Sequence, residues 1–279
     1  MKPMLLSDML NNVRGNVPLV HCITNYVTVN DCANALLACG GSPIMSDEPK
    51  DVSDITSICG GLVLNIGTLN ERSIEAMRIS ATRAGELGHT IVLDPVGAGA
   101  STLRTQTATR LLDEFPITVV RGNMSEIRAL AGMSAQTRGV DANPADAVDE
   151  SNLADSARYI RELARKWDCV VAVTGAIDVV ADASSVFAVR NGVPMMGKIT
   201  GAGCMLTCVL AAYVTANSEY AFAAAAAAVA GMGLSGQIAQ GRLQTLDGTG
   251  AFRSYLIDAL SNMDAQTLEA GARIEELSL

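Results

Sequence analysis

The feature that most constrains the fold is a regular alternation of short β-branched segments with longer amphipathic ones. Six segments rich in Val, Ile and Leu predict strands, at 18–23, 43–45, 61–67, 90–96, 117–122 and 169–175. Short apolar runs of this kind, bounded by turn-forming residues, are typical of strands buried on both faces of a parallel sheet. The alternation therefore predicts an α/β fold in which helices cover both faces of a central, mostly parallel sheet.

Amphipathic segments between the strands predict the helices that connect them. The segment 70–88 carries Ile74, Met77, Ile79 and Leu87, and the segment 153–167 carries Ala154, Ala157, Ile160, Leu163 and Ala164. Such spacing is typical of a helix with apolar side chains on one side. We expect both segments to be crossover helices between parallel strands.

The pattern changes after residue 175. The segments 177–182 and 185–190, whose connection includes Ala-Ser-Ser at 183–185, predict an antiparallel hairpin on the sheet edge. From Gly201 to the end, the sequence predicts three or four helices. The segment 134–150, rich in Asp, Asn, Gly and Pro, predicts a surface excursion rather than a linker. We therefore expect residues 1–279 to form one domain.

Composition and charge argue against several classes of partner. The net charge of −9, with no concentration of Lys and Arg, makes nucleic acid an unexpected partner. The first ten residues lack the apolar core of a signal peptide, so we expect a cytoplasmic location. The Ala-rich segment 219–234 is shorter than the about 20 residues of a membrane span, and we expect a pair of buried helices here and no membrane contact. The seven cysteines include no CxxC pair, and most are expected to be buried apolar side chains.

A Gly-Ala-Gly turn at 201–203 precedes the apolar segment CMLTCVLAAYV, which predicts a helix that begins at the turn. Backbone N–H groups at such a helix N-terminus point outward and bind anions. An isolated GxG is equally typical of a tight turn that packs under a helix. The turn alone leaves both interpretations open.

Polar residues at three strand ends favour the anion-binding interpretation. Asp94 lies at the end of one predicted strand, Arg121, Asn123 and Glu126 lie at the end of the next, and Thr174 lies at a third. Open α/β sheets bind ligands at the carboxyl ends of their strands, where we expect these side chains to converge. Each has a simpler interpretation alone, as a turn former, a surface ion pair or a capping residue. Together, two carboxylates, a guanidinium, a hydroxyl and an anion-binding turn suit a magnesium nucleotide and a transferred phosphoryl group.

Segments throughout the chain resemble the hydroxyethylthiazole kinase family. In chain order they are HCITNYVTVND, GLVLNIGTLN, VLDPVGAGAS, VVRGNMSEI, AVTGAIDVVAD and KITGAGCMLT. The resemblance covers almost the whole chain. It also implies membership of the wider group of ribokinase-like kinases, which carry a C-terminal GAGD preceded by NxxE, here Asn123 to Glu126.

The resemblance implies a ribokinase-like α/β fold and a homotrimer with active sites at the subunit interfaces. It also implies that ATP, with Mg²⁺, phosphorylates the primary alcohol of 4-methyl-5-(2-hydroxyethyl)thiazole in the salvage route to thiamine. The residues it implies are Asn25, Val27, Met45, Gly67 and Gly201 for the thiazole; Arg121, Asn123 and Thr174 for ATP; Asp94 and Glu126 for the metal; and Gly201, Ala202, Gly203 and Cys204 for catalysis. From spacing alone, Met45 would be an ordinary core residue.

Cys204 is the residue at which the sequence departs from the wider group. The resemblance implies that this position corresponds to the aspartate that, in most ribokinase-like kinases, takes the proton from the substrate hydroxyl, and this chain has a cysteine there. A thiol has an ordinary pKa of about 8.5. We expect positioning and charge stabilisation to supply most of the rate, with the base a minor contribution.

Three alternative functions stay open. Another salvage kinase of the same group would act on hydroxymethylpyrimidine or pyridoxal, although HCITN and GAGC are specific to the thiazole kinases. A cysteine-nucleophile enzyme would use Cys204 at a helix N-terminus, but only His21 lies near a strand end that faces it, and an orienting group is missing. A non-catalytic nucleotide-binding module would not require Asp94, Arg121 and Glu126 together.

Overall fold

The computed structural model describes residues 6–133 and 148–279, so most of the predicted excursion at 134–150 lies outside the described residues. The described part of the chain forms a nine-stranded sheet in the order β2-β1-β3-β4-β5-β6-β7-β8-β9. The strands are β1 (Leu19–Ile23), β2 (Ser42–Ile44), β3 (Gly61–Asn65), β4 (Thr90–Asp94), β5 (Val119–Asn123), β6 (Val170–Thr174), β7 (Asp178–Ala181), β8 (Val186–Val189) and β9 (Ile274–Glu276). β1 to β6 pair in parallel, and β7, β8 and β9 pair antiparallel to their neighbours.

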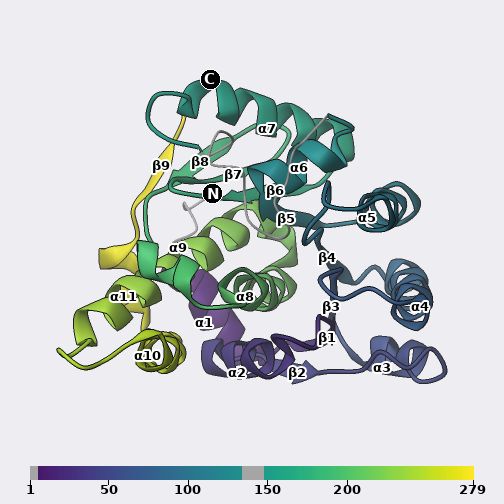
Figure 1. Cartoon of the computed structure of the whole chain (residues 1–279), viewed down its shortest axis with the longest axis horizontal. Coiled ribbons are helices and arrows are strands. Elements are labelled where there is room, and N and C mark those ends of the chain that lie inside the picture. Colours follow the sequence, from purple (N-terminus) through teal and green to yellow (C-terminus); the bar gives the residue numbers. More distant parts are fainter. Residues whose placement is uncertain (1–5, 134–147) are drawn as a thin grey trace.

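Helices lie on both faces of the sheet and give three layers (Figure 1). They are α1 (Leu6–Asn16), α2 (Val29–Cys39), α3 (Val52–Ile58), α4 (Glu71–Leu87), α5 (Thr102–Glu114), α6 (Met124–Leu130), α7 (Leu153–Trp167), α8 (Ala202–Ala216), α9 (Ala221–Arg242), α10 (Thr249–Asn262) and α11 (Ala265–Gly271). α3 to α7 cover one face, and α1, α2, α8 and α9 cover the other. The predicted α/β architecture is confirmed.

Side chains of the central strands alternate between the two helical layers. In β3, Leu62 and Leu64 pack in the core beneath α4, whereas Val63 packs in the core that contains α8. The neighbouring strand β4 repeats this alternation with Val92 and Leu93. Because successive side chains point to opposite faces and both faces are covered, these strands are continuous apolar runs.

The predicted hairpin is correct, but its position at the sheet edge is wrong. β7 and β8 pair antiparallel, with Asp178 opposite Val189. β9 adds a further strand outside β8, with Phe187 opposite Glu276. Its sequence, Ile-Glu-Glu, is short and largely charged, so the hydrophobic pattern that predicts the other strands does not detect it.

α4 and α7 are the predicted crossover helices. Met77 of α4 is buried as predicted, and α7 buries four of its five predicted residues: Ala157, Ile160, Leu163 and Ala164. The buried residues of α4 are mostly small: Ser73, Ala76, Met77, Ser80, Ala81 and Ala84. Ile74 and Ile79 are only half-buried, and Leu87 is exposed. In α7, Leu153 is buried and Ala154 is exposed. In α4, the small buried side chains favour close packing of the helix on the sheet, which leaves Ile74, Ile79 and Leu87 at the margin of the contact.

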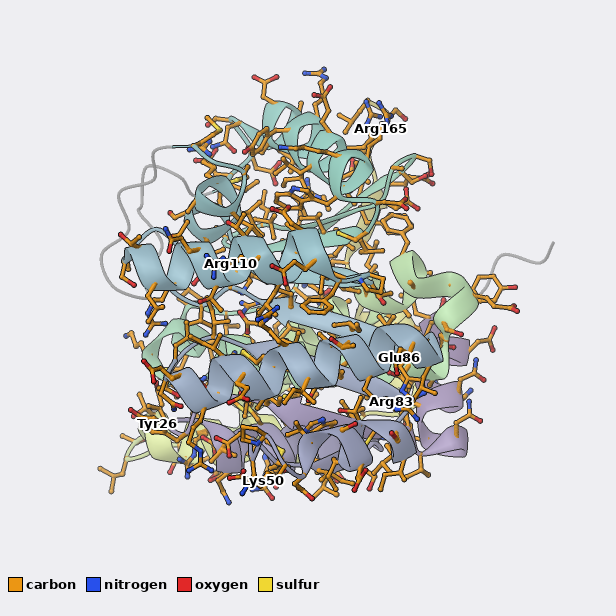
Figure 2. All side chains as sticks on the ribbon, turned by 90° about the vertical axis from the view of Figure 1, so that its right-hand side faces the viewer. Tyr26, Lys50, Arg83, Glu86, Arg110 and Arg165 are labelled. Atoms are coloured by element: carbon orange, nitrogen blue, oxygen red, sulfur yellow. The ribbon has the colours of Figure 1, made fainter. Side chains whose placement is uncertain are left out.

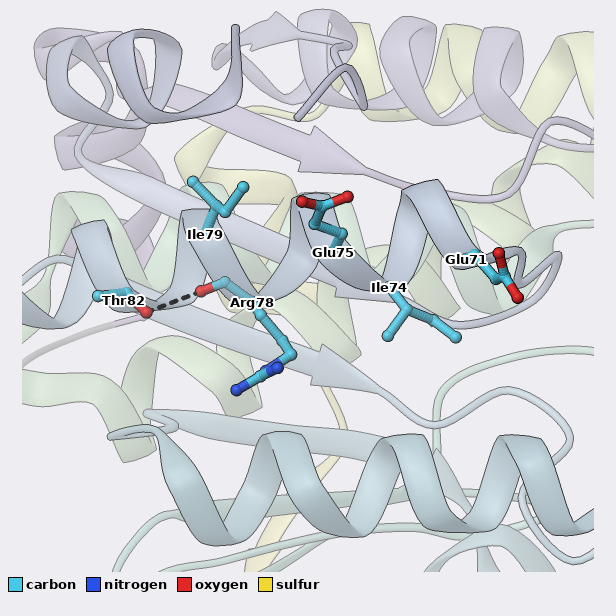
Figure 3. A pocket seen from close by; sticks show the side chains of 6 residues that line it. All are labelled: Glu71, Ile74, Glu75, Arg78, Ile79 and Thr82. Atoms are coloured by element: carbon cyan, nitrogen blue, oxygen red, sulfur yellow. Dashed lines mark hydrogen bonds between the residues drawn. The ribbon is translucent and has the colours of Figure 1, made fainter. Parts of the chain in front are cut away.

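Ile74 and Ile79 instead line a shallow pocket of about 430 Å³ on the outer side of α4 (Figure 3). The other lining residues are Glu71, Glu75, Arg78 and Thr82. The pocket contains none of the residues predicted for the functional site.

α8 and α9 are the predicted pair of buried helices. Within the described residues, Ser218–Arg242 is the segment long and apolar enough to span a membrane by length and composition, and 72% of its apolar window is buried inside the molecule. The helix α9 packs against β6, β7, β8, α8 and α10. At Gly233, α9 lies close to Asn191 and Gly192, which precede the 3₁₀ segment Pro194–Lys198. A Cβ added to Gly233 would lie 2.7 Å from Asn191 Cβ and 2.9 Å from the Gly192 nitrogen.

This close approach predicts a difference between two glycines of α9. Gly233→Ala should destabilise the protein by about 2 kcal/mol or more, because backbone atoms must move to admit the methyl group. Gly241→Ala, where nothing lies within 4 Å of the added atom, should be neutral or stabilising by up to about 1 kcal/mol. Denaturant unfolding of both variants measures the difference, and equal stabilities would contradict the packing described.

Candidate active site

The strand register places polar residues side by side at the carboxyl edge of the sheet. Asn65, the last residue of β3, is opposite Asp94, the last residue of β4. Asn123 of β5 is opposite Thr174 of β6 in the same way. The N-terminus of α8 meets this edge, because Cys204 in the first turn of that helix is hydrogen-bonded to Asn65 and to Asn25, which follows β1. The predicted convergence of strand ends is therefore present.

Two asparagine amides hold the Cys204 sulfur. The Nδ2 atoms of Asn25 and Asn65 each lie 3.2 Å from Cys204 Sγ. Asn25 Nδ2 also donates to Asn65 Oδ1 at 3.1 Å, and Asn65 Nδ2 donates to Asp94 Oδ2 at 2.8 Å. The thiol is thus fixed within a chain of hydrogen bonds that begins at the β1 loop and ends at Asp94.

Asp94 is fully buried, and one of its two oxygens is unpaired. Oδ2 accepts hydrogen bonds from Asn65 and from Thr207 Oγ1, the latter at 2.7 Å, and lies 3.6 Å from Arg121 Nη1. Oδ1 is buried and has no hydrogen-bond partner among the described residues. Burial raises the pKa of the Asp94 carboxyl, and Arg121 opposes that shift. A buried carboxylate oxygen without a partner is costly, so it marks a position at which a bound group would be stabilised.

Glu126 is held by backbone N–H groups. Its Oε1 accepts from Gly97 N and its Oε2 from Asn123 N, each at 2.8 Å, while Asn123 Oδ1 accepts from Glu126 N. The last two bonds form a capping box at the start of α6. Burial, and next the charge of Asp94, raise the pKa of Glu126 to about 7. A substantial fraction of Glu126 is therefore protonated at neutral pH.

Arg121 and the Gly-Ala-Gly turn fit one another sterically. Arg121 Nη2 donates to Thr174 Oγ1 at 2.6 Å, and a Cβ on Gly203 would lie 2.5 Å from Arg121 Nη1. Gly201 has φ +86° in the left-handed region, and a Cβ there would lie 2.5 Å from Thr28 Cγ2. The left-handed backbone at Gly201 therefore favours glycine, and a side chain on Gly203 would displace the Arg121 guanidinium, whereas Ala202 between them carries a side chain.

The environment of Cys204 disfavours a reactive thiolate. Burial, and then the charge of Asp94, raise the pKa of Cys204 to about 11. His21, the histidine considered as its base, is fully buried, with Nδ1 2.9 Å from Thr56 Oγ1 and Nε2 2.9 Å from the Ser46 carbonyl oxygen. Both ring nitrogens are occupied away from the thiol, so the cysteine-nucleophile alternative lacks a base.

The residues predicted for the thiazole lie at different places around this cluster. Gly67 joins it, because its N–H donates to Asn65 Oδ1 at 3.0 Å and a Cβ there would lie 2.9 Å from Asn25. Val27 is 60% exposed, in the turn that follows Asn25. Met45 is half-buried and packs against the core that contains α8. Val27 and Met45 lie outside the hydrogen-bonded cluster.

Several residues of the cluster were not predicted. Asn65 ends a strand as Asp94 does, so the same strand-end pattern would have indicated it. Thr207 lies three residues after Cys204 and shares its helix face, a spacing that would also have indicated it. Thr28 packs against Gly201. Arg104 donates hydrogen bonds to the carbonyl oxygens of Ile66, Val96 and Gly67. No sequence pattern predicts either contact.

Comparison with known proteins gives the family. The model of the hydroxyethylthiazole kinase family matches residues 10–266. The hydroxyethylthiazole kinase of Clostridium acetobutylicum is 50% identical over 271 residues, which are 97% of this chain and 99% of that protein. The solved structure of hydroxyethylthiazole kinase from Pyrococcus horikoshii OT3 matches with a TM-score of 0.86 and 33% identity, and the match covers 98% of this chain and 99% of that one. The structure of a ribokinase-like superfamily protein from Enterococcus faecalis V583 shares the fold, with a TM-score of 0.60 and 12% identity. That match covers 93% of this chain and 95% of the other. The chain has a ribokinase-like fold and belongs to the hydroxyethylthiazole kinase family.

Proposed function

We propose that this protein transfers the γ-phosphoryl group of ATP to the primary alcohol of 4-methyl-5-(2-hydroxyethyl)thiazole, in thiamine salvage. Membership of a kinase family supports phosphoryl transfer from ATP to a small molecule. The observation that carries the proposal is the cluster of Asp94 and Arg121 beside the N-terminus of α8. A buried carboxylate with an unpaired oxygen, a guanidinium and outward N–H groups are the parts that a metal nucleotide requires.

The direct test of the proposed substrate is a coupled assay of ADP release. Thiazole ethanol, hydroxymethylpyrimidine and pyridoxal would be compared as competing alcohols, each with and without Mg²⁺. The proposal expects a clear preference for the thiazole alcohol and a requirement for the cation. A preference for either of the other two alcohols would contradict it.

Asp94 and Glu126 have the chemistry to hold Mg²⁺. Both supply carboxylate oxygens, the ligands of a hard cation, and Asp94 Oδ1 has no partner among the described residues. Within the described part of the chain, no three acidic, His or Cys side chains gather as a cage. This suits Mg²⁺, which keeps several waters and shares phosphate oxygens with one or two carboxylates. When bound, the cation would neutralise charge on the transferred phosphoryl group.

We propose that the protein's own groups mainly position the reactants and stabilise charge. Arg121 and Thr174 would contact ATP, with Asn123 beside them, and the N–H groups of Gly201–Gly203 would form the anion hole for the transferred phosphate. Gly203 leaves room for the Arg121 guanidinium directly against this turn, which supports their joint role. The charges are fixed before the substrate arrives, so little reorganisation is needed during the reaction.

Asn25 and Cys204 are proposed to orient the alcohol. Asn25 is buried and hydrogen-bonded to both Asn65 and Cys204, so its side chain has a defined position. With a pKa of about 11, Cys204 is a protonated thiol at neutral pH and a poor general base. Phosphoryl transfer through a loose transition state asks little of the attacking hydroxyl, so positioning should outweigh proton removal.

We also propose one cytoplasmic kinase domain over residues 1–279 that assembles as a homotrimer. Tyr26 and Val27, in the loop that follows Asn25, are 76% and 60% exposed in the single chain (Figure 2 labels Tyr26). Apolar side chains exposed beside a small-molecule site support a pocket that a neighbouring subunit completes. Sedimentation of an active monomer would contradict this assembly.

Asp94→Asn tests the proposed metal site in a protein that keeps its fold. The new amide oxygen can accept from Asn65 and Thr207, so the protein should stay folded. The thermal midpoint should fall, because the ion pair with Arg121 is lost and the amide nitrogen takes the place of Oδ1, which has no partner among the described residues. Turnover should fall by about 10²–10³-fold, with a higher Mg²⁺ requirement, because the charge is lost. Asp155→Asn, on the exposed face of α7, is the control. Steady-state kinetics at varied Mg²⁺ measure the effect, and wild-type turnover in Asp94→Asn would refute the metal assignment.

Substitutions at Cys204 measure the size of the base contribution. Cys204→Ser keeps a small group that accepts from Asn25 and Asn65, and should retain activity within about 10²-fold of wild type. Cys204→Asp offers a carboxylate to the same two amides and should stay active or improve. Steady-state turnover, with thiazole binding by calorimetry as the control for an intact pocket, checks both. Loss of turnover in both variants with binding intact would contradict the positioning account.

A further inference from the structure

Arg104, near the start of α5, hydrogen-bonds to the two loops that carry the site. Its Nη1 donates to the Ile66 carbonyl oxygen at 3.0 Å and to the Val96 carbonyl oxygen at 2.8 Å, and its Nη2 donates to the Gly67 carbonyl oxygen at 2.7 Å. The first and third of these oxygens lie after β3, and the second lies after β4. Among the described residues, these side-chain hydrogen bonds all go to main-chain carbonyls, so the guanidinium holds backbone rather than an acidic partner.

The peptide groups bound by Arg104 are held at their other ends by site residues. In the peptide between Ile66 and Gly67, the carbonyl accepts from Arg104 and the N–H donates to Asn65 Oδ1 at 3.0 Å. In the peptide between Val96 and Gly97, the carbonyl accepts from Arg104 and the N–H donates to Glu126 Oε1 at 2.8 Å. The Arg104 guanidinium is therefore connected through one peptide group to Asn65, which holds Cys204, and through another to Glu126, a proposed metal ligand.

The geometry of this connection depends on an arginine. A planar guanidinium offers several donors in fixed directions, whereas a lysine ammonium is a compact charge that cannot span carbonyls from two loops in the same way. The guanidinium also packs on Gly97, which has φ +72° and whose added Cβ would lie 3.2 Å from Arg104 Nη1. A cation on the carbonyl side of a peptide polarises it and strengthens the hydrogen bond that its N–H donates.

We propose that Arg104 is a positioning residue that fixes the substrate loop at Gly67 and the metal loop at Gly97 relative to one another. The inference rests on the proposed function, since Gly67 is a proposed thiazole contact and Gly97 orients the proposed metal ligand Glu126. Arg104 acts only through these backbone groups and does not contact the reacting atoms. Its loss loosens both loops at once, while the nucleotide contacts on β5 and β6 stay in place.

The test compares Arg104→Lys and Arg104→Met with Arg110→Lys and Arg110→Met. Arg110 is an exposed arginine later in the same helix (Figure 2) and is the matched control. Steady-state kinetics would give the KM for the thiazole alcohol, the Mg²⁺ concentration for half-maximal rate, and the KM for ATP at saturating Mg²⁺. In both Arg104 variants, the first two should rise about tenfold and kcat/KM for the alcohol should fall by up to about 10²-fold. The KM for ATP and all parameters of the Arg110 variants should match wild type.

The outcomes separate this inference from the proposed function. If wild-type protein does not phosphorylate the thiazole alcohol, the proposed function fails first. If wild type is active and the Arg104 variants keep its alcohol KM and Mg²⁺ requirement, the inference is overturned, even where their thermal midpoints fall. Should Arg104→Met not fold, Arg104→Lys decides, because it keeps the aliphatic stem and the charge. Recovery of Arg104→Ala by added guanidinium ion, but not by methylammonium, would support the planar contact, and equal effects of the two ions would count against it.

Discussion

The carboxylate of Asp94 is completely buried, and residues from several elements hold it in place. Asn65 from β3 and Thr207 from α8 donate to its Oδ2, and Arg121 from β5 lies 3.6 Å away. Because an ionised carboxylate is costly to bury without partners, its position ties these three elements together at the end of the sheet. The same charge acts on its neighbours, since it contributes to the raised pKa of both Glu126 and Cys204. The site is therefore one electrostatic unit.

The sequence predicted those features that depend on local pattern. Buried parallel strands are continuous apolar runs, and their carboxyl ends share one edge, so Asp94, Arg121 and Thr174 were expected to meet and do so through hydrogen-bonded or ion-paired contacts. The strand β9 was missed because two of its three residues are charged and its pairing is set by the tertiary fold. Arg104 was missed because its partners are carbonyls of distant loops, which leave no mark on side-chain pattern.

Steric contacts explain the two glycines of the GAGC turn at 201–204, but not its cysteine. Gly201 is favoured by its left-handed backbone and by the close approach of Thr28, and the lack of a side chain at Gly203 leaves space for the Arg121 guanidinium. Cys204 needs a different explanation, because its thiol is buried, amide-bound and protonated at neutral pH. A small polar group that accepts hydrogen bonds from both Asn25 and Asn65 explains the residue without a role as nucleophile or strong base.

We propose that Asp94 and Glu126 form an acidic pair that binds a divalent cation. Calorimetric titration of the protein with Mg²⁺ and ADP, repeated in buffers of different ionisation heat, measures the number of protons released when the two bind. Since the pKa of Glu126 is raised to about 7 and a cation binds the carboxylate form, release should approach one proton per site at about pH 6 and decline toward zero at about pH 8. The same titration of Glu126→Gln measures the protons that ADP itself releases when it binds Mg²⁺, because its phosphate has a second pKa of about 6. The release predicted for Glu126 is the excess of wild type over this variant. Equal proton counts in wild type and Glu126→Gln at about pH 6 would contradict the account.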